Sequence, residues 1–139
     1  MDPTRLTEAV KALVQLVDRL RGPGGCPWDA KQTDSSIKVY LIEEAYEVLD
    51  ALEKSIPEEV CMELGDLLFH VVFLAKLAEE RNEFDFVEVV EKITEKMVRR
   101  HPHVFGDVRV DNAEDVAYNW ARIKRNETVS YTHLTLPTN

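Results

Sequence analysis

The segment from Val60 to Ala78 is apolar on almost every side of the helix that its composition predicts. Such a helix must be covered all round, because apolar surface left in water is unfavourable. A chain of 139 residues can build one core but has little apolar material to spare. We therefore expect one small domain that buries this helix in a bundle, with part of its surface in a contact between subunits.

Helical periodicity also extends through most of the chain on either side of this segment. We predict helices over about 4–21, 37–55, 57–81 and 86–101, and a last one capped by Asp111 or Asn112. Glycine and proline at 22–25 end the first helix and open a loop that runs to Ser36. No stretch of useful length alternates as strands do, so the predicted fold is all-α, a helical bundle.

The last twelve residues, 128–139 (TVSYTHLTLPTN), differ from the rest. They contain no Asp, Glu, Lys or Arg, and the helical stripe does not continue through them. We predict a folded domain over 1–127 and a disordered or non-native tail over 128–139. We also expect the native chain to continue differently after Glu127.

Composition and charge narrow the possible partners and the compartment. The net charge of −9 argues against nucleic acid, which requires a basic face. Cys26 and Cys61 make no disulfide framework, which fits a reducing compartment. There is no signal-like segment and no apolar run of about 20 residues that would span a bilayer. A cytoplasmic protein without a membrane partner is the expectation.

Two pairs of carboxylates, Glu44 with Glu47 and Glu63 with Asp66, are the leading candidates for chemistry. Residues three apart on a helix lie on one face, and both pairs fall within the apolar arc of their helix. A carboxylate that faces a core is costly unless it is paired or binds a metal. Four converging oxygen ligands would suit Mg²⁺, with Mn²⁺ as a substitute.

An isolated acidic pair on a helix is usually a solvated face, so the alternatives matter. A di-iron site of the ferritin type needs two Glu-x-x-His motifs, and no Glu here is followed by His three residues later. Glu59 and His70 share the face of Glu63 and Asp66, and we interpret His70 as a second-layer or core residue. Gly65 is expected to allow close helix packing.

Cations and aromatic rings are also spaced to meet a phosphate-bearing ligand. Lys96 and Arg100 lie four residues apart, as do Trp120 and Lys124, and each pair projects from one helix face. Taken singly, each is also explained as a surface charge or a core anchor. Trp28, in the loop, is either a lid packed on the bundle or a stacking partner for a base, and the sequence leaves both open.

Over residues 5–127 the chain resembles the MazG family of all-α nucleoside triphosphate pyrophosphohydrolases, above all the N-terminal domain of longer members. The resemblance rests on five segments: GGCPWDAKQT at 24–33, LIEEAYEVLDAL at 41–52, ELGDLLFHVVF at 63–73, FDFVEVVEKITEKMVRRHPHVFGD at 84–107 and WARIK at 120–124. One departure is Asp34, where the family often has His after Gln-Thr, so a base contact from this loop is in doubt.

The resemblance implies roles for the candidate residues. Glu44, Glu47, Glu63 and Asp66 match the family's Mg²⁺ ligands. Substrate handling falls to a second group of positions: Trp28, Lys96, Arg100, Trp120 and Lys124. The fold implied is a four-helix core completed by dimerisation, as a homodimer or a higher oligomer.

The implied reaction is Mg²⁺-dependent hydrolysis of nucleoside triphosphates to monophosphate and pyrophosphate. Lys96 and Arg100 would neutralise developing charge, and Glu47 or a neighbouring acid would serve as base. The alternative is a catalytically weak dimerisation or regulatory domain at the N-terminus of a longer two-domain protein.

Overall fold

The computed structural model describes the backbone of residues 1–135 and the side chains of residues 1–128, and every regular element in that part is a helix. The chain divides into two compact units, Met1–Val89 and Val90–Asn139, and each is described by itself. The prediction of an all-α fold is confirmed. None of the described helices is both long and apolar enough to cross a bilayer.

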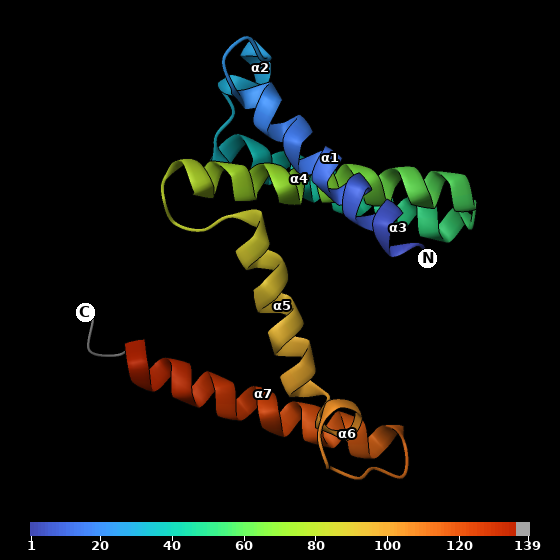
Figure 1. The fold of residues 1–139 in the computed structure, drawn as a ribbon. Helices are drawn as coiled ribbons and strands as arrows, with labels where there is room; N and C mark the ends of the chain where they lie inside the picture. The colour runs from blue at the N-terminus through green and yellow to red at the C-terminus, as the bar shows by residue number, and fades with distance from the viewer. Residues whose placement is uncertain (136–139) are drawn as a thin grey trace. The chain divides into compact units, whose positions relative to one another are not determined.

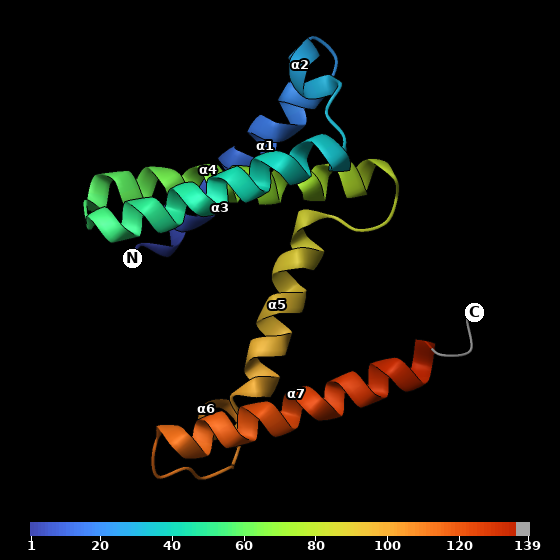
Figure 2. The same ribbon diagram turned by 180° about the vertical axis from the view of Figure 1, so that it is seen from behind.

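The first unit is built on two long antiparallel helices crossed by a third (Figures 1 and 2). Its elements are α1 (Pro3–Arg21), α2 (Pro27–Ala30), α3 (Asp34–Lys54), α4 (Pro57–Glu80) and the start of α5 (Phe86–Arg100). Helices α3 and α4 pack along their length, and α1 lies across α4. The carboxylate pairs of α3 and α4 are therefore carried by neighbouring helices.

Local signals set the ends of these helices. Thr33 and Ser36 form a reciprocal capping box, so α3 begins at Asp34, three residues before the predicted start. Ser55 takes a left-handed conformation (φ 56°) that ends α3, and Pro57 then begins α4 at the position where a missing N–H costs nothing. The Asp85 carboxylate caps the following helix, accepting from the Glu88 backbone N–H at 2.9 Å.

The core of the first unit lies where α1, α3 and α4 meet. Its buried residues are Val17, Ile37, Val72, Phe73 and Leu77. All five come from predicted apolar stripes, and half-buried side chains such as Tyr40 and Phe69 close the cluster. The amino-terminal half of α4 is less covered, since Met62 is 71% exposed in the single chain. The expected subunit contact over this helix stays a prediction.

Gly65 does not act as expected within the chain. A Cβ placed there would meet no atom within 4 Å, so packing of α3 against α4 does not require a glycine at this position. The prediction of a close helix contact is wrong for the described chain.

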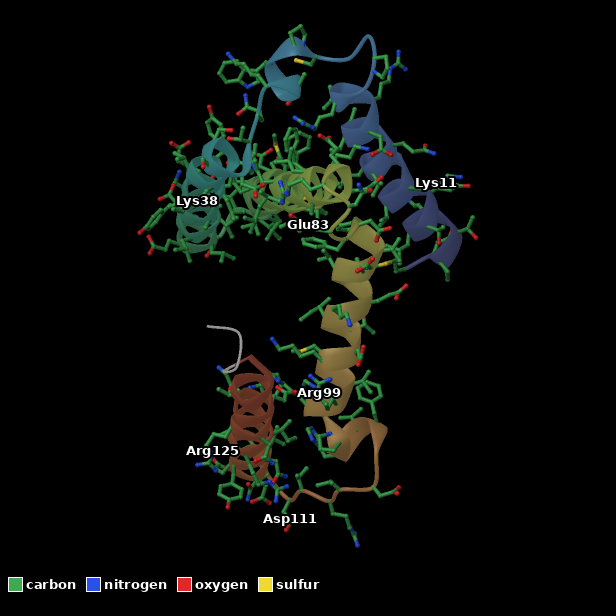
Figure 3. All side chains as sticks on the ribbon, turned by 90° about the vertical axis from the view of Figure 1, so that its left-hand side faces the viewer. Lys11, Lys38, Glu83, Arg99, Asp111 and Arg125 are labelled. Atoms are coloured by element: carbon green, nitrogen blue, oxygen red, sulfur yellow. The ribbon has the colours of Figure 1, made fainter. Side chains whose placement is uncertain are left out.

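The second unit holds the rest of α5, then α6 (Pro102–Phe105) and α7 (Ala113–Thr135). Figure 3 shows Arg99 on α5 and Arg125 on α7. The cap of α7 is Asn112, whose side chain accepts from the Asp115 backbone N–H at 2.9 Å. Because α7 continues to Thr135, residues 128–135 are helical where the sequence predicted a disordered or non-native tail. A non-native origin stays a prediction, and residues 136–139 lie outside the described part.

Candidate metal centre and nucleotide-binding residues

Helices α3 and α4 bring three of the four predicted ligands together. One carboxylate oxygen from each of Glu44, Glu63 and Asp66 lies within 4.8 Å of the other two. Glu63 and Asp66 share a face because they are one turn apart on α4, and Glu44 meets them from α3. Glu47 is exposed and lies outside this cluster, so its role as a ligand stays a prediction.

The environment of the cluster is unfavourable for bare carboxylates. Glu44 and Glu63 are half-buried, and Asp66 is exposed. Oxygen Oε2 of Glu44 is buried and has no hydrogen-bond partner among the described residues. Desolvation raises the pKa of Glu63 above its usual value, and the charges of Asp66, Glu44 and Glu47 raise it further. The three acids therefore repel one another where water is partly excluded.

A divalent cation would resolve this conflict. Ionised carboxylates in a desolvated cluster are costly unless they are protonated or bind a cation. An oxygen-only donor set suits a hard cation, and no histidine joins the cluster within the described part of the chain. The residues present therefore fit a metal centre of the Mg²⁺ type better than a di-iron centre.

A cavity of about 270 Å³ lies at the carboxyl-terminal side of the acidic residues of α4. Trp28, Asp29 and Gln32 line one side of it, and the opposite wall comes from α3 and α4: Ile37, Tyr40, Phe69, His70 and Phe73. Trp28 is 54% exposed, with the Lys31 ammonium 4.3 Å from the centre of its ring. The ring is therefore no buried lid, and an apolar cavity with a few polar groups is typical of a ligand pocket.

Three polar residues flagged by the sequence have partners outside the acidic cluster. The Nδ1 atom of His70 lies 2.9 Å from the Asp66 carbonyl oxygen, so this nitrogen must carry the proton that it donates. Asp34 pairs with Arg81 of α4 at 3.2 Å, which ties the start of α3 to the end of α4. Glu59 lies 3.9 Å from Lys54. His70 lines the cavity and is not in the metal cluster, as the sequence suggested.

The predicted substrate-side cations and the second tryptophan belong to the second unit. Arg100 is buried, 9% exposed, and its Nη2 donates to the Glu127 carboxylate at 2.8 Å. Its guanidinium carbon lies 5.4 Å from the Trp120 ring centre, so these two predicted residues are in contact. Lys96 is half-buried and Lys124 is exposed.

Sequence reasoning missed the acidic partner in this group. Glu127 bonds both Arg99, at 2.6 Å, and Arg100, and these hydrogen bonds hold the pKa of Glu127 below its usual range, with Arg100 the larger cause. The residue had been used only as the end of the domain. An acid three residues after Lys124 on the helix was the available signal, but its pairing with a residue 27 positions earlier has no local signature.

Comparisons with known proteins agree with this geometry. Residues 32–105 match the model of the MazG nucleotide pyrophosphohydrolase domain. The "Nucleoside triphosphate pyrophosphohydrolase" of Escherichia coli K12 is 45% identical over 119 residues, which cover 85% of this chain and 45% of that protein. The "Nucleoside triphosphate pyrophosphohydrolase/pyrophosphatase MazG" of Thermotoga maritima is 50% identical over 95 residues, covering 68% and 37% respectively.

Two further matches extend the comparison. The "Uncharacterized protein YabN" of Bacillus subtilis is 48% identical over 112 residues, which are 81% of this chain and 23% of that protein. The crystal structure of a mazG-related protein from Thermotoga maritima superposes with a TM-score of 0.69 at 26% identity, covering 83% of this chain and 98% of that one. The chain spans less than half the length of each of the three curated relatives.

Proposed function

This chain belongs to the MazG nucleotide pyrophosphohydrolase family, and we propose that it hydrolyses nucleoside triphosphates to the monophosphate and pyrophosphate. The observation that carries the proposal is the convergence of Glu44, Glu63 and Asp66 within 4.8 Å. The unpartnered buried oxygen of Glu44 supports it, because a solvated acidic face would leave no such atom.

The metal that best suits the cluster is Mg²⁺, with Mn²⁺ as a substitute. Glu44, Glu63 and Asp66 would hold it, with Glu47 as the fourth ligand or as the base that takes a proton from the attacking water. When bound, the ion supplies Lewis acidity for the phosphate oxygens and lowers the pKa of water. Cleavage of the link between the α- and β-phosphates then releases pyrophosphate.

The chain's cations would meet the negative charge of the substrate. Lys96, Arg100 and Lys124 are proposed to neutralise charge on the phosphoryl oxygens, which is the main catalytic task in phosphoryl transfer. Arg100 already holds a carboxylate in a fork geometry that also suits phosphate. Trp28 and Trp120 are proposed to contact the base or sugar.

The exposed apolar side chains of the first unit support a homodimer as the working form. On α3 they recur every three or four residues, which makes one continuous stripe apart from the buried one. The set, each between 45 and 71% exposed, is Val39, Ile42, Tyr46, Leu49 and Leu52 on α3 with Met62, Leu64 and Leu68 on α4. A patch of this kind marks a protein interface, and a second copy offers the same apolar chemistry.

Sedimentation equilibrium tests the homodimer. The wild type should sediment as a dimer and Leu49→Asp as a monomer, because the charge would be buried unpaired. Leu16→Asp, at an exposed site on α1 (49%), should remain dimeric. A monomeric wild type would contradict the proposal.

A second candidate function is a catalytically weak dimerisation or regulatory domain of a longer protein. The observation that favours it is length, since the chain covers 45% of the Escherichia coli relative and 23% of the Bacillus subtilis one. On this alternative the acids would still bind a cation, and turnover would be absent.

Product analysis of the full chain with a panel of ribo- and deoxyribonucleoside triphosphates separates the two candidates. The proposed function requires monophosphate and pyrophosphate in equal amounts with Mg²⁺ and none with EDTA. Cation binding without product would favour the regulatory alternative. Orthophosphate and diphosphate as products would contradict both.

A further inference from the structure

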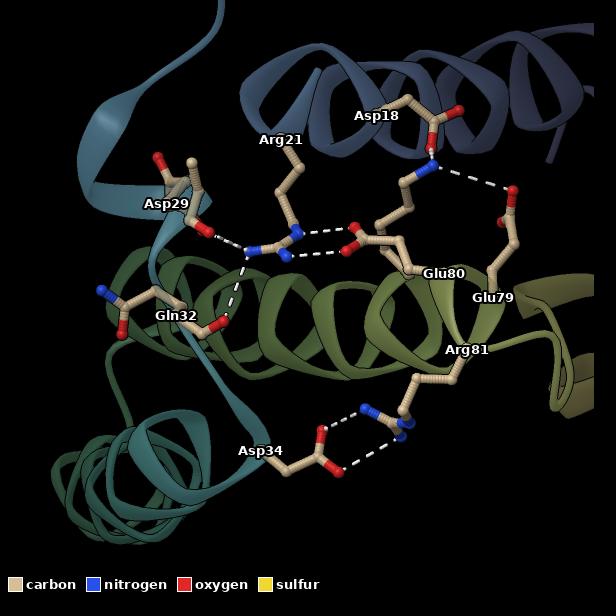
Figure 4. A network of polar contacts seen from close by, with 10 residues as sticks. Asp18, Arg21, Asp29, Gln32, Asp34, Glu79, Glu80 and Arg81 are labelled. Atoms are coloured by element: carbon tan, nitrogen blue, oxygen red, sulfur yellow. Dashed lines mark hydrogen bonds and ion pairs between the residues drawn. The ribbon is translucent and has the colours of Figure 1, made fainter. Parts of the chain in front are cut away.

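Arg21, the last residue of α1, joins three segments of the first unit. Its side chain is only 10% exposed, and Nε and Nη2 donate to the two oxygens of Glu80 at 2.6 and 2.7 Å (Figure 4). Its Nη1 donates in the other direction, to the Asp29 carbonyl oxygen at 2.5 Å, with the carbonyl of Gln32 at 3.4 Å. One planar guanidinium thus bonds a helix on one side and the α2 loop on the other.

The α2 segment depends on such contacts for its position. A helix of four residues is too short to be stable alone. Gln32, which is 7% exposed, donates its side-chain amide to the Trp28 carbonyl at 2.8 Å. At the other end, the chain passes so close to α1 that a Cβ on Gly25 would lie 2.4 Å from the Leu20 carbonyl oxygen. The two buried polar side chains therefore hold the backbone of residues 28–32.

This segment forms one wall of the cavity beside the acidic cluster. Trp28, Asp29 and Gln32 face the cavity, and Phe73 on the opposite wall lies 5.5 Å from the Arg21 guanidinium carbon. A small displacement of α2 would change the width of the cavity without disturbing the acids of α3 and α4. Control of the loop is thus separable from control of the metal centre.

We propose that Arg21, oriented by Glu80 and assisted by Gln32, is a positioning residue that holds α2 and Trp28 over the cavity and so sets affinity for the base of the nucleotide. The proposal rests on the proposed function above. A purely structural role is already filled nearby, since Lys76 of α4 bonds Asp18 of α1 at 3.1 Å without contacting the loop.

The test compares Arg21→Lys with Asp18→Asn. Lysine keeps a positive charge for Glu80, but one ammonium cannot replace a fork that serves a carboxylate and a carbonyl at once. The control removes the other pair between α1 and α4 and leaves the loop contacts intact. Three quantities are measured for each: KM and kcat for a nucleoside triphosphate, and the inhibition constant of inorganic tripolyphosphate, which lacks a base.

Arg21→Lys should raise KM about tenfold, the order expected when one charge-assisted hydrogen bond is lost, with kcat and the tripolyphosphate constant changed less than about twofold. Asp18→Asn should leave all three unchanged. An unchanged KM in Arg21→Lys, an equal rise in the tripolyphosphate constant, or an equal effect of Asp18→Asn would overturn the proposal.

Two additions keep the outcome decisive. If Arg21→Lys does not fold, Gln32→Leu removes only the bond to the Trp28 carbonyl and should shift KM in the same direction. If the wild type shows no turnover, the proposed function fails, and calorimetric dissociation constants for the triphosphate and tripolyphosphate replace KM and the inhibition constant. Selective weakening of the nucleotide alone would still support the positioning role.

Discussion

Removal of the Phe73 ring should weaken the first unit more than any other truncation. The side chain is 0% exposed at the meeting point of α1, α3 and α4, and its ring lies 5.9 Å from that of Phe69. Truncation of a buried Phe to Ala costs about 3–5 kcal/mol, from the lost transfer free energy and the cavity left behind. The additional contacts with Phe69 and Arg21 place the expected loss near about 4–5 kcal/mol.

The assay is urea unfolding followed by circular dichroism, at one fixed protein concentration because the stability of a dimer depends on it. A domain of this size has about 5–15 kcal/mol in total, so Phe73→Ala should unfold at very low urea and Phe73→Leu between it and the wild type. The control is Phe84→Ala, which makes the same chemical change at a side chain 41% exposed and should cost about 1 kcal/mol. A loss for Phe73→Ala no larger than for Phe84→Ala would refute this description of the core.

Three further predictions concern titration and capping. Glu63 has a raised pKa, so in EDTA its ionised form opposes folding and the protein gains stability as pH falls through that pKa; Glu63→Gln should remove this gain in pH-dependent unfolding. Glu80 has a pKa lowered by its hydrogen bond to Arg21, so its contribution is present above the unfolded value and lost as pH falls through the folded one; Glu80→Gln should flatten the acid limb of the same curve. Thr33→Ala should cost about 1 kcal/mol in urea unfolding by breaking the α3 capping box, whereas an equal loss in Ser35→Ala would show that the cap is not the cause.

The sequence predicted long elements well because their signals are local and repeated. The end of α1 at Arg21 and the start of α4 at Pro57 follow from glycine and proline positions that need no tertiary information. The short helices α2 and α6 were missed, since four residues show no periodicity. Each begins with a proline, Pro27 and Pro102, which was the available signal.

The acidic cluster was accessible for a similar reason, since spacing on one helix predicts which acids share a face. Glu44, Glu63 and Asp66 converge as expected, although spacing could not show that Glu47 lies outside the cluster. The pairing of Arg21 with Glu80, 59 residues apart, depends on how α1 crosses α4. Neither residue stands out in its own segment, so only the folded chain identifies the contact.

Binding of Mn²⁺, followed by its paramagnetic resonance signal and competed with Mg²⁺, tests the proposed metal centre most directly. We expect the wild type to bind Mn²⁺, and Glu63→Gln to weaken binding at least about tenfold, since even changes behind the ligands have effects of that size. The matched control is Glu43→Gln on the exposed face of α3 beside Glu44, which should bind as the wild type does. Equal Mn²⁺ affinity in the wild type and Glu63→Gln would contradict a metal centre built on Glu44, Glu63 and Asp66.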